Sequence, residues 1–84
     1  MNYVYVLKSI KDNKLYIGST SDIAKRIKSH NSGKVRSTKS RRPLELVYTE
    51  SCNSVTASRK RENFLKSGQG RKWLKEFFRD NIIM

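Results

Sequence analysis

In the first twenty residues, two short apolar runs flank a polar stretch, a pattern that is typical of a β-hairpin. Residues 2–8 are rich in β-branched and aromatic residues. Apolar side chains fall on both faces of the expected strand, which predicts an interior strand covered on both sides. Residues 14–18 have the composition of a partner strand. Between them, Asp12 and Asn13 tolerate the bends of a tight connection. The pattern therefore predicts an antiparallel pair.

The register of this pair places Tyr5, Tyr16 and Gly18 on one face of the sheet. A loop of even length pairs odd positions of one strand with even positions of the other, and side chains alternate by face. Two phenols then stand beside a residue without a side chain, where a substrate backbone can approach or a bulge can form. The alternative is ordinary sheet packing, because tyrosine pairs stabilise sheets.

Residues 19–33 have the pattern of an amphipathic helix with its end signals. Thr20 or Ser21 is expected to cap the N-terminus, with Asp22 in the first turn and Gly33 at the C-terminal end. The apolar stripe of this helix consists of Ile23, Ala24 and Ile27.

The second half of the chain predicts one more strand and two more helices. In order, a basic loop, a strand and two helices are expected at residues 34–43, 44–50, 54–67 and 68–81. The apolar positions of these two helices are Ala57, Phe64, Leu65, Trp73, Leu74, Phe77 and Phe78, and Arg61 falls among the first three. The order β-β-α-β-α-α predicts an α+β fold, a small three-stranded antiparallel sheet flanked by helices.

Composition narrows the function classes. The chain has 84 residues, which predicts a single domain over residues 1–84. Its net charge is +12, from 19 Lys+Arg against 7 Asp+Glu, and such self-repulsion favours a polyanionic partner, with nucleic acid the first choice. A membrane surface and a solvated surface without a partner remain as alternatives.

The sequence disfavours disulfide-bonded, zinc-binding, secreted and membrane-spanning proteins. Cys52 is the only cysteine, so no internal disulfide forms, and with one histidine a Cys/His zinc site is not expected. The apolar start is too short for a signal peptide, and no stretch approaches the roughly 20 apolar residues of a membrane span. These features predict a cytoplasmic protein with no membrane contact and no evident obligatory protein partner.

Three further residues carry candidate chemistry. Arg26 and His30 are four apart, so they lie on one helix face, and His30 lies close to the apolar stripe and points toward the sheet. A buried structural histidine beside a salt-bridged arginine is the alternative. Glu62 lies among cations in "SRKREN", where it can hold one Mg²⁺ or simply pair with Lys66.

Taken in order, these residues resemble a known family. "YVY", then "YIG", an arginine, a histidine four residues later and a glutamate on a helix are similar to the GIY-YIG nuclease family. The resemblance covers essentially the whole chain. It extends to the segments "HNSGKVRSTKSRRP" and "ASRKRENFLK", which are similar to those of the small single-domain bacterial members.

The resemblance implies a role for each matching residue. Tyr5 and Tyr16 match the tyrosines of the two halves of the motif, and Gly18 matches its closing glycine. Arg26 and His30 match the arginine and histidine of the helix. Glu62 matches the carboxylate that binds a single divalent metal, Mg²⁺ or Mn²⁺.

The chain departs from the family pattern at a few positions. The first half reads Tyr3-Val4-Tyr5, without the leading glycine, and Ser19 stands where some members carry a lysine. An asparagine that some members use downstream of the glutamate has no clear match. These departures concern the details of activation.

The implied function is a divalent-metal-dependent endonuclease that hydrolyses phosphodiester bonds, with DNA as the expected substrate and RNA left open. Arg26 would stabilise charge at phosphorus, and a tyrosine, Tyr5 before Tyr16, would help deprotonate the water with His30. The residues expected to contact the nucleic acid are Gly18, Lys34, Arg36, Lys39, Arg41, Arg42 and Lys66. The alternative is a non-catalytic basic nucleic-acid-binding module that retains the fold; a ribosome- or membrane-associated basic protein comes third.

Overall fold

The structure is a computed structural model, and it describes residues 1–80. Its elements are β1 (Asn2–Ser9), β2 (Leu15–Thr20), α1 (Ile23–Asn31), the short 3-10 helix η1 (Lys39–Arg41), β3 (Leu44–Cys52), α2 (Val55–Lys66) and α3 (Gly68–Asp80). The predicted α+β class and the order β-β-α-β-α-α are confirmed; η1 lies inside the predicted loop. Residue 81, predicted in the last helix, lies outside the described residues. Within residues 1–80, no helix has the length and apolar character that a membrane crossing requires.

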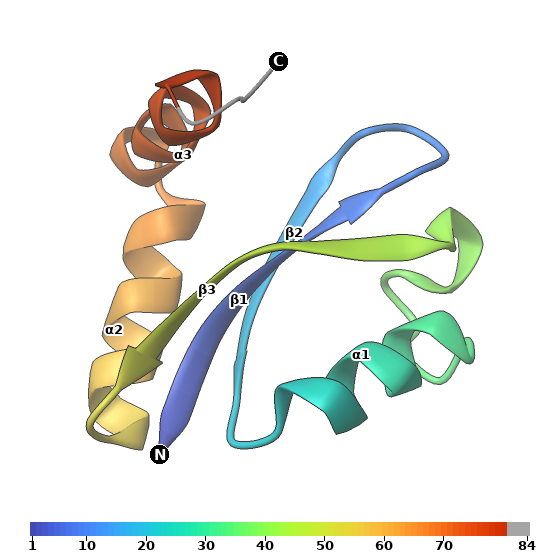
Figure 1. Cartoon of the computed structure of the whole chain (residues 1–84), viewed down its shortest axis with the longest axis horizontal. Coiled ribbons are helices and arrows are strands. Elements are labelled where there is room, and N and C mark those ends of the chain that lie inside the picture. The colour runs from blue at the N-terminus through green and yellow to red at the C-terminus, as the bar shows by residue number, and fades with distance from the viewer. Residues whose placement is uncertain (81–84) are drawn as a thin grey trace.

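Strand β1 is the centre of the molecule. The three strands are antiparallel in the order β2-β1-β3, so both edges of β1 are paired. Figure 1 shows α2 and α3 on one side of the sheet and α1 on the other. Val4 and Val6 pack toward Leu65 and Leu74 on the first side, whereas Tyr5 and Leu7 pack with Ile27 and Leu44 on the second. The predicted interior strand, covered on both faces, is confirmed.

The hairpin has the predicted register. Tyr5 lies opposite Gly18 and Leu7 opposite Tyr16, so the two tyrosines share a face with the glycine. The turn closes with a hydrogen bond from the Asn13 amide to the Ser9 carbonyl, 2.8 Å, and Asn13 adopts φ 61°, a conformation that asparagine tolerates well.

Helix α1 begins later than the sequence predicts. Thr20 is still paired with β1, so neither Thr20 nor Ser21 caps the helix. The N-cap is Asp22, whose carboxylate accepts from the amide of Lys25 at 3.0 Å. At the other end Gly33 follows the C-cap with φ 82°, which confirms the predicted stop.

Two alanines assigned to the buried stripes are exposed instead. Ala24 is exposed, whereas Ile23 and Ile27 are half-buried and His30 is buried. Ala57 is exposed as well. The buried line of α2 runs through Ser58 and Leu65, which are two turns apart, and Ala57 lies one residue off that line.

Arg61 lies among the apolar residues of α2 for a clear reason. Its guanidinium donates to the Glu50 carboxylate on β3 at 2.8 Å. The same group lies 5.0 Å from the ring centre of Phe64 and 4.9 Å from that of Trp73. An arginine can therefore occupy this face, since the aromatic rings and a carboxylate both stabilise the cation.

Helices α2 and α3 meet at Gly70. The Ser67 hydroxyl accepts from the Gly70 amide at 3.2 Å and so supports the start of α3. Gly70 is buried, and a Cβ at this position would overlap the carbonyl of Phe64 and the Cα of Leu65. The close packing of the two helices therefore requires a residue without a side chain.

Replacing Gly70 by alanine should destabilise the fold. The methyl group meets backbone, which cannot rotate away, so we expect Gly70→Ala to lower the free energy of unfolding by roughly 1–3 kcal/mol. Gly68→Ala is the matched control, because a Cβ there meets nothing within 4 Å. Its effect should be neutral or a gain below about 1 kcal/mol. Urea unfolding of both variants measures this, and equal stability of the two would contradict the packing described.

Candidate active site

A hollow of about 510 Å³ lies across the edge strand β2. One wall comes from β1, α1 and the loop before η1, and the other from α2 and α3. The hollow brings together seven of the residues singled out in the sequence: Tyr5, Tyr16, Gly18, Arg26, His30, Glu62 and Lys66. These residues are spread over most of the chain, so the fold is what assembles them.

The Tyr5 hydroxyl is the centre of one wall. Arg26 donates to it through Nε at 3.1 Å, and Nε2 of His30 lies 3.1 Å from it. The rings of Tyr5 and His30 meet edge to face with centroids 5.9 Å apart. Both contacts come from one turn of α1, as the spacing of Arg26 and His30 predicts. Tyr5 itself is only 3% exposed, so its phenol is held in a defined position.

His30 is buried and hydrogen-bonded on both ring nitrogens. Its Nδ1 lies 2.8 Å from Oγ1 of Thr38, and the residue is 4% exposed. Burial lowers the pKa of His30 below its ordinary value, and the nearby Arg26 cation lowers it further. The imidazole is therefore neutral at pH 7 and has a lone pair available to accept a proton.

Gly18 makes room for the Tyr5 phenol. A Cβ at position 18 would overlap the hydroxyl oxygen and the Cζ atom of Tyr5 across the strand pair. The glycine thus leaves room for the end of the Tyr5 ring, whose hydroxyl reaches Arg26 and His30. This reason for a glycine is additional to the close approach of a substrate that the sequence predicts.

Glu62 lies on the other wall, on α2. Its Oε1 accepts from the Ser19 hydroxyl at 2.8 Å, and its Oε2 from the Lys66 ammonium at 2.7 Å. Burial alone would raise the pKa of Glu62, but the hydrogen bonds from Lys66 and Ser19 and the charges of Lys66 and Arg59 outweigh it. The pKa is lowered overall, so Glu62 is ionised at pH 7.

The donor set fits a metal ion that takes most of its ligands from outside the protein. Within residues 1–80 no group of three or more His, Cys, Asp or Glu side chains gathers at one point. Glu62 is the carboxylate of the hollow. Mg²⁺ is commonly held by one or two carboxylates together with substrate phosphate and water, which one ionised glutamate can satisfy.

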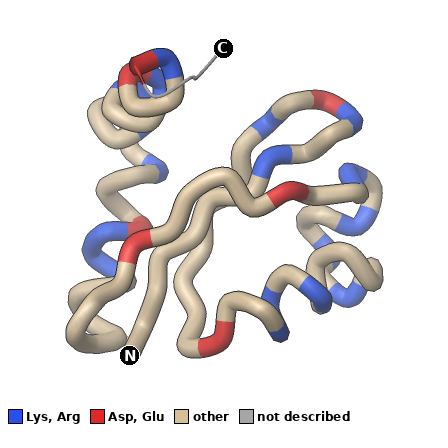
Figure 2. The backbone as a smooth tube through the Cα atoms, in the orientation of Figure 1, with Lys and Arg blue, Asp and Glu red and all other residues tan. Residues whose placement is uncertain are grey.

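The basic loop residues lie elsewhere. Lys34, Arg36, Lys39 and Arg42 are exposed and lie outside the hollow. Arg41 forms a salt bridge with Asp12 of the hairpin turn, so part of its charge is already neutralised within the protein. Figure 2 shows Lys and Arg along α1 and the loop after it, and further Lys and Arg on the α2 and α3 side, so positive charge lies on both sides of the sheet.

Four polar residues of the hollow escaped the sequence analysis as candidates: Ser19, Ser37, Thr38 and Arg71. Ser19 follows Gly18 in the strand and was noted only as a departure from the family pattern. Ser37 and Thr38 lie in a loop without periodicity, and Arg71 is one of many cations of the last helix. No sequence signal distinguishes the last three from their neighbours.

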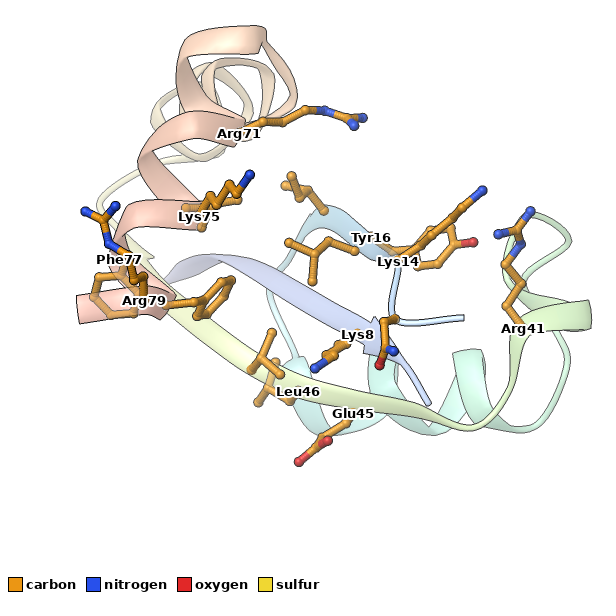
Figure 3. A pocket seen from close by; sticks show the side chains of 16 residues that line it. Lys8, Lys14, Tyr16, Arg41, Glu45, Leu46, Arg71, Lys75, Phe77 and Arg79 are labelled. Atoms are coloured by element: carbon orange, nitrogen blue, oxygen red, sulfur yellow. The ribbon is translucent and has the colours of Figure 1, made fainter. Parts of the chain in front are cut away.

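A larger groove of about 1380 Å³ lies between α3 and the far end of the hairpin. Figure 3 shows Arg71, Lys75 and Arg79 along α3, with Lys8, Lys14 and Arg41 across from them. Its acidic lining residue is Glu45, and it contains no histidine. Tyr16 and Arg71 line both depressions. The residues able to carry out acid–base chemistry therefore lie in the smaller hollow. The groove is a basic surface that is continuous with it.

Adding a methyl group at Gly18 should displace the Tyr5 phenol. We expect Gly18→Ala to cost roughly 1–3 kcal/mol of stability by overpacking. In the Tyr5→Phe background the hydroxyl is gone, so the same substitution should cost less, and a double-mutant cycle measured by urea unfolding isolates this difference. Equal costs in both backgrounds would show that the hydroxyl is not what Gly18 accommodates.

Comparison with known proteins gives a consistent result. The family description "GIY-YIG catalytic domain" matches residues 1–75. UPF0213 protein SH2523 of Staphylococcus haemolyticus is 45% identical over 67 residues, covering 79% of this chain and 80% of that protein. A UPF0213 protein of Syntrophus aciditrophicus is 48% identical over 67 residues, covering 77% of this chain and 76% of that protein. The solution NMR structure of the UPF0213 protein BH0048 from Bacillus halodurans superimposes with a TM-score of 0.54 at 37% identity, over 92% of this chain and 85% of that one. The chain therefore belongs to the GIY-YIG family, together with small UPF0213 proteins.

Proposed function

We propose that this protein is a divalent-metal-dependent endonuclease that hydrolyses phosphodiester bonds in nucleic acid, with DNA as the expected substrate. One observation carries the proposal: the Tyr5 hydroxyl contacts both a neutral, buried His30 and the cation of Arg26. Such a phenol has a donor on one side and a proton acceptor on the other. It is prepared to lose its proton to the imidazole while it takes one from water.

The proton transfers follow from this geometry. The Tyr5 proton moves to Nε2 of His30, and the phenol oxygen takes a proton from a water molecule in the hollow. The oxygen of that water forms the new bond to phosphorus, and the ester bond to the leaving oxygen breaks. His30 then carries the extra proton as imidazolium, until solvent or the leaving oxygen removes it.

Arg26 is suited to two tasks. Through Nε it donates to the Tyr5 oxygen, which stabilises negative charge on the phenol as its proton leaves. The two terminal nitrogens of the planar guanidinium are the groups that would hold a phosphate oxygen. Charge that develops at phosphorus is then met by a fixed cation, and this kind of preorganised stabilisation is commonly the largest contribution to catalysis.

Glu62 is the residue that would hold the metal. A divalent ion supplies Lewis-acid stabilisation of the phosphate and of the leaving oxygen. Glu62 lines the hollow from α2, on the other wall from Tyr5, so a phosphate that bound over β2 would lie between the two residues. Lys66 now donates to the carboxylate; when released, it becomes a further cation for the phosphate backbone.

A second candidate function has its own supporting observation. Both carboxylate oxygens of Glu62 already accept hydrogen bonds, from Ser19 and Lys66. A chain in which this arrangement persisted would bind nucleic acid through its basic surface without cutting it. The net charge of +12 supports binding in either case.

Replacing Tyr5 and replacing Tyr16 should change the rate of cleavage by different amounts. Tyr5→Phe removes the hydroxyl that contacts Arg26 and His30, so cleavage should fall by roughly 10²–10⁴-fold, the usual contribution of positioned proton transfer. Tyr16→Phe is the matched control, since Tyr16 lines the same hollow and no hydrogen bond joins it to His30 among those of residues 1–80. Tyr16→Phe should lower the rate of cleavage by at most about tenfold. Single-turnover cleavage measures both, and the reverse order would assign the base to Tyr16.

Glu62→Gln tests the enzyme against the binding module. We expect wild type to nick plasmid or branched DNA with Mg²⁺ or Mn²⁺. The variant should lose cleavage but keep or gain affinity, because a negative charge facing phosphate is removed. Glu45→Gln makes the same change in the other groove and should leave cleavage intact. The readouts are a cleavage time course with metal titration, a binding isotherm and thermal melts.

Two outcomes would contradict the proposal. Undiminished cleavage by Glu62→Gln would remove this carboxylate from the site. A wild type that binds DNA but never cuts it with either metal would favour the binding module.

A further inference from the structure

We infer that Thr38 is a positioning residue, whose buried hydroxyl holds His30 in the tautomer that leaves Nε2 free to accept the Tyr5 proton. The inference rests on the proposed function for its catalytic meaning, and it names a residue in a loop that the sequence assigned only to phosphate contacts. It follows from the hydrogen bonds around two buried side chains.

Thr38 is placed to contact one nitrogen of the imidazole. Its side chain is 1% exposed, and Oγ1 lies 2.8 Å from Nδ1 of His30. The same hydroxyl reaches the carbonyl of Val35 at 3.4 Å, and the Thr38 amide donates to that carbonyl at 3.2 Å. A threonine hydroxyl has one proton to donate and two lone pairs. It can therefore give its proton to Val35 and accept one from His30.

Counting donors and acceptors selects this arrangement. The guanidinium of Arg26 can only donate, so the proton of the Tyr5 hydroxyl needs a different acceptor. Among the contacts of the Tyr5 hydroxyl within residues 1–80, Nε2 of His30 is the one group able to accept. Nε2 must then be unprotonated, and the single proton of the neutral imidazole lies on Nδ1, where Thr38 accepts it.

The opposite tautomer leaves a buried group without a partner. If Nε2 carried the proton, the Tyr5 oxygen would receive two donors, from Arg26 and His30. Its own proton would then have no acceptor in the protein, although Tyr5 is only 3% exposed. Buried hydroxyl groups are rarely left in this state because the lost hydrogen bond costs free energy.

The loop that carries Thr38 is tied to the hairpin that carries Tyr5. The Ser9 hydroxyl donates to the Arg41 carbonyl at 2.7 Å, and the Ile10 amide donates to the Pro43 carbonyl at 3.0 Å. The backbone amide of Arg41 in turn donates to the backbone carbonyl of Thr38 at 3.0 Å. These bonds keep Thr38 at a fixed distance from β1, so the histidine is positioned from both sides.

The test uses the fact that His30 is the only histidine of the chain. The ¹⁵N NMR spectrum of the imidazole distinguishes a protonated from an unprotonated ring nitrogen without ambiguity of assignment. In the metal-free wild type near pH 8 we expect a protonated Nδ1 and an unprotonated Nε2. Thr38→Val keeps the shape but removes the acceptor, so the signals should shift toward the other tautomer. Thr38→Ser restores the hydroxyl and should restore the wild-type pattern.

Cleavage kinetics provide the second readout. Thr38→Val should lower kcat roughly 10- to 100-fold, a part of what positioned proton transfer contributes, with little change in KM. Thr38→Ser should stay within a few-fold of wild type.

The results separate the two proposals. A wild type with the proton on Nε2 would overturn the inference, and this measurement needs no variant, so misfolding of Thr38→Val cannot hide it. A Thr38→Val protein with unchanged tautomer would overturn it as well. If the NMR results agree with expectation but no protein cuts nucleic acid, the proposed nuclease function is wrong and the role of Thr38 in holding the tautomer stands.

Discussion

Burial of strand β1 on both faces is the constraint on which the rest of the molecule depends. Val4 and Val6 fill the core beneath α2 and α3, and the residues between them, Tyr5 and Leu7, pack on the α1 side. A slip of one residue would exchange these two sets, placing a phenol in the aliphatic core. The hydrophobic packing of one face therefore fixes the position of the candidate catalytic tyrosine on the other, and the register of the sheet serves stability and chemistry at once.

The position of the hollow across an edge strand follows from the same topology. Because β2 pairs on one side only, its free edge lets groups from both faces of the sheet meet. Gly18 faces Tyr5, and the next residue, Ser19, faces α2 and donates to Glu62. Two layers that the sheet otherwise separates thus contribute to one depression. The α1 wall is secured at its end by Asn31, whose side-chain amide exchanges two hydrogen bonds with the backbone of Leu44, 3.0 and 2.7 Å.

Periodic features of the fold could be predicted from the sequence, and features set by distant contacts could not. Alternation placed Tyr5 beside Gly18, and helical spacing placed Arg26 beside His30. The start of α1 was missed because Thr20 still pairs with β1, a contact that competes with capping and cannot be seen locally. Arg61 fits an apolar helix face only because Glu50 and two aromatic rings surround it. Lys66 meets Glu62 at helical spacing, but the Ser19 partner of Glu62 comes from a strand and the Thr38 partner of His30 from an aperiodic loop, so these two contacts depend on the fold.

The protonation states of the hollow depend on cations that also build it. Burial lowers the pKa of His30 and the Arg26 cation lowers it further, so the imidazole stays neutral, while Nε of Arg26 donates to the Tyr5 oxygen. Lys66 helps to lower the pKa of Glu62 against burial, so the carboxylate stays charged in the same depression. A neutral imidazole and an ionised carboxylate thus coexist in one depression near pH 7, because their partners shift the two pKa values in ways that suit each group. Removing Arg26 would disturb the tyrosine, the histidine and the proposed phosphate contact together. The energetic effects of substitutions at these residues should therefore be strongly non-additive, as expected for groups that share one network.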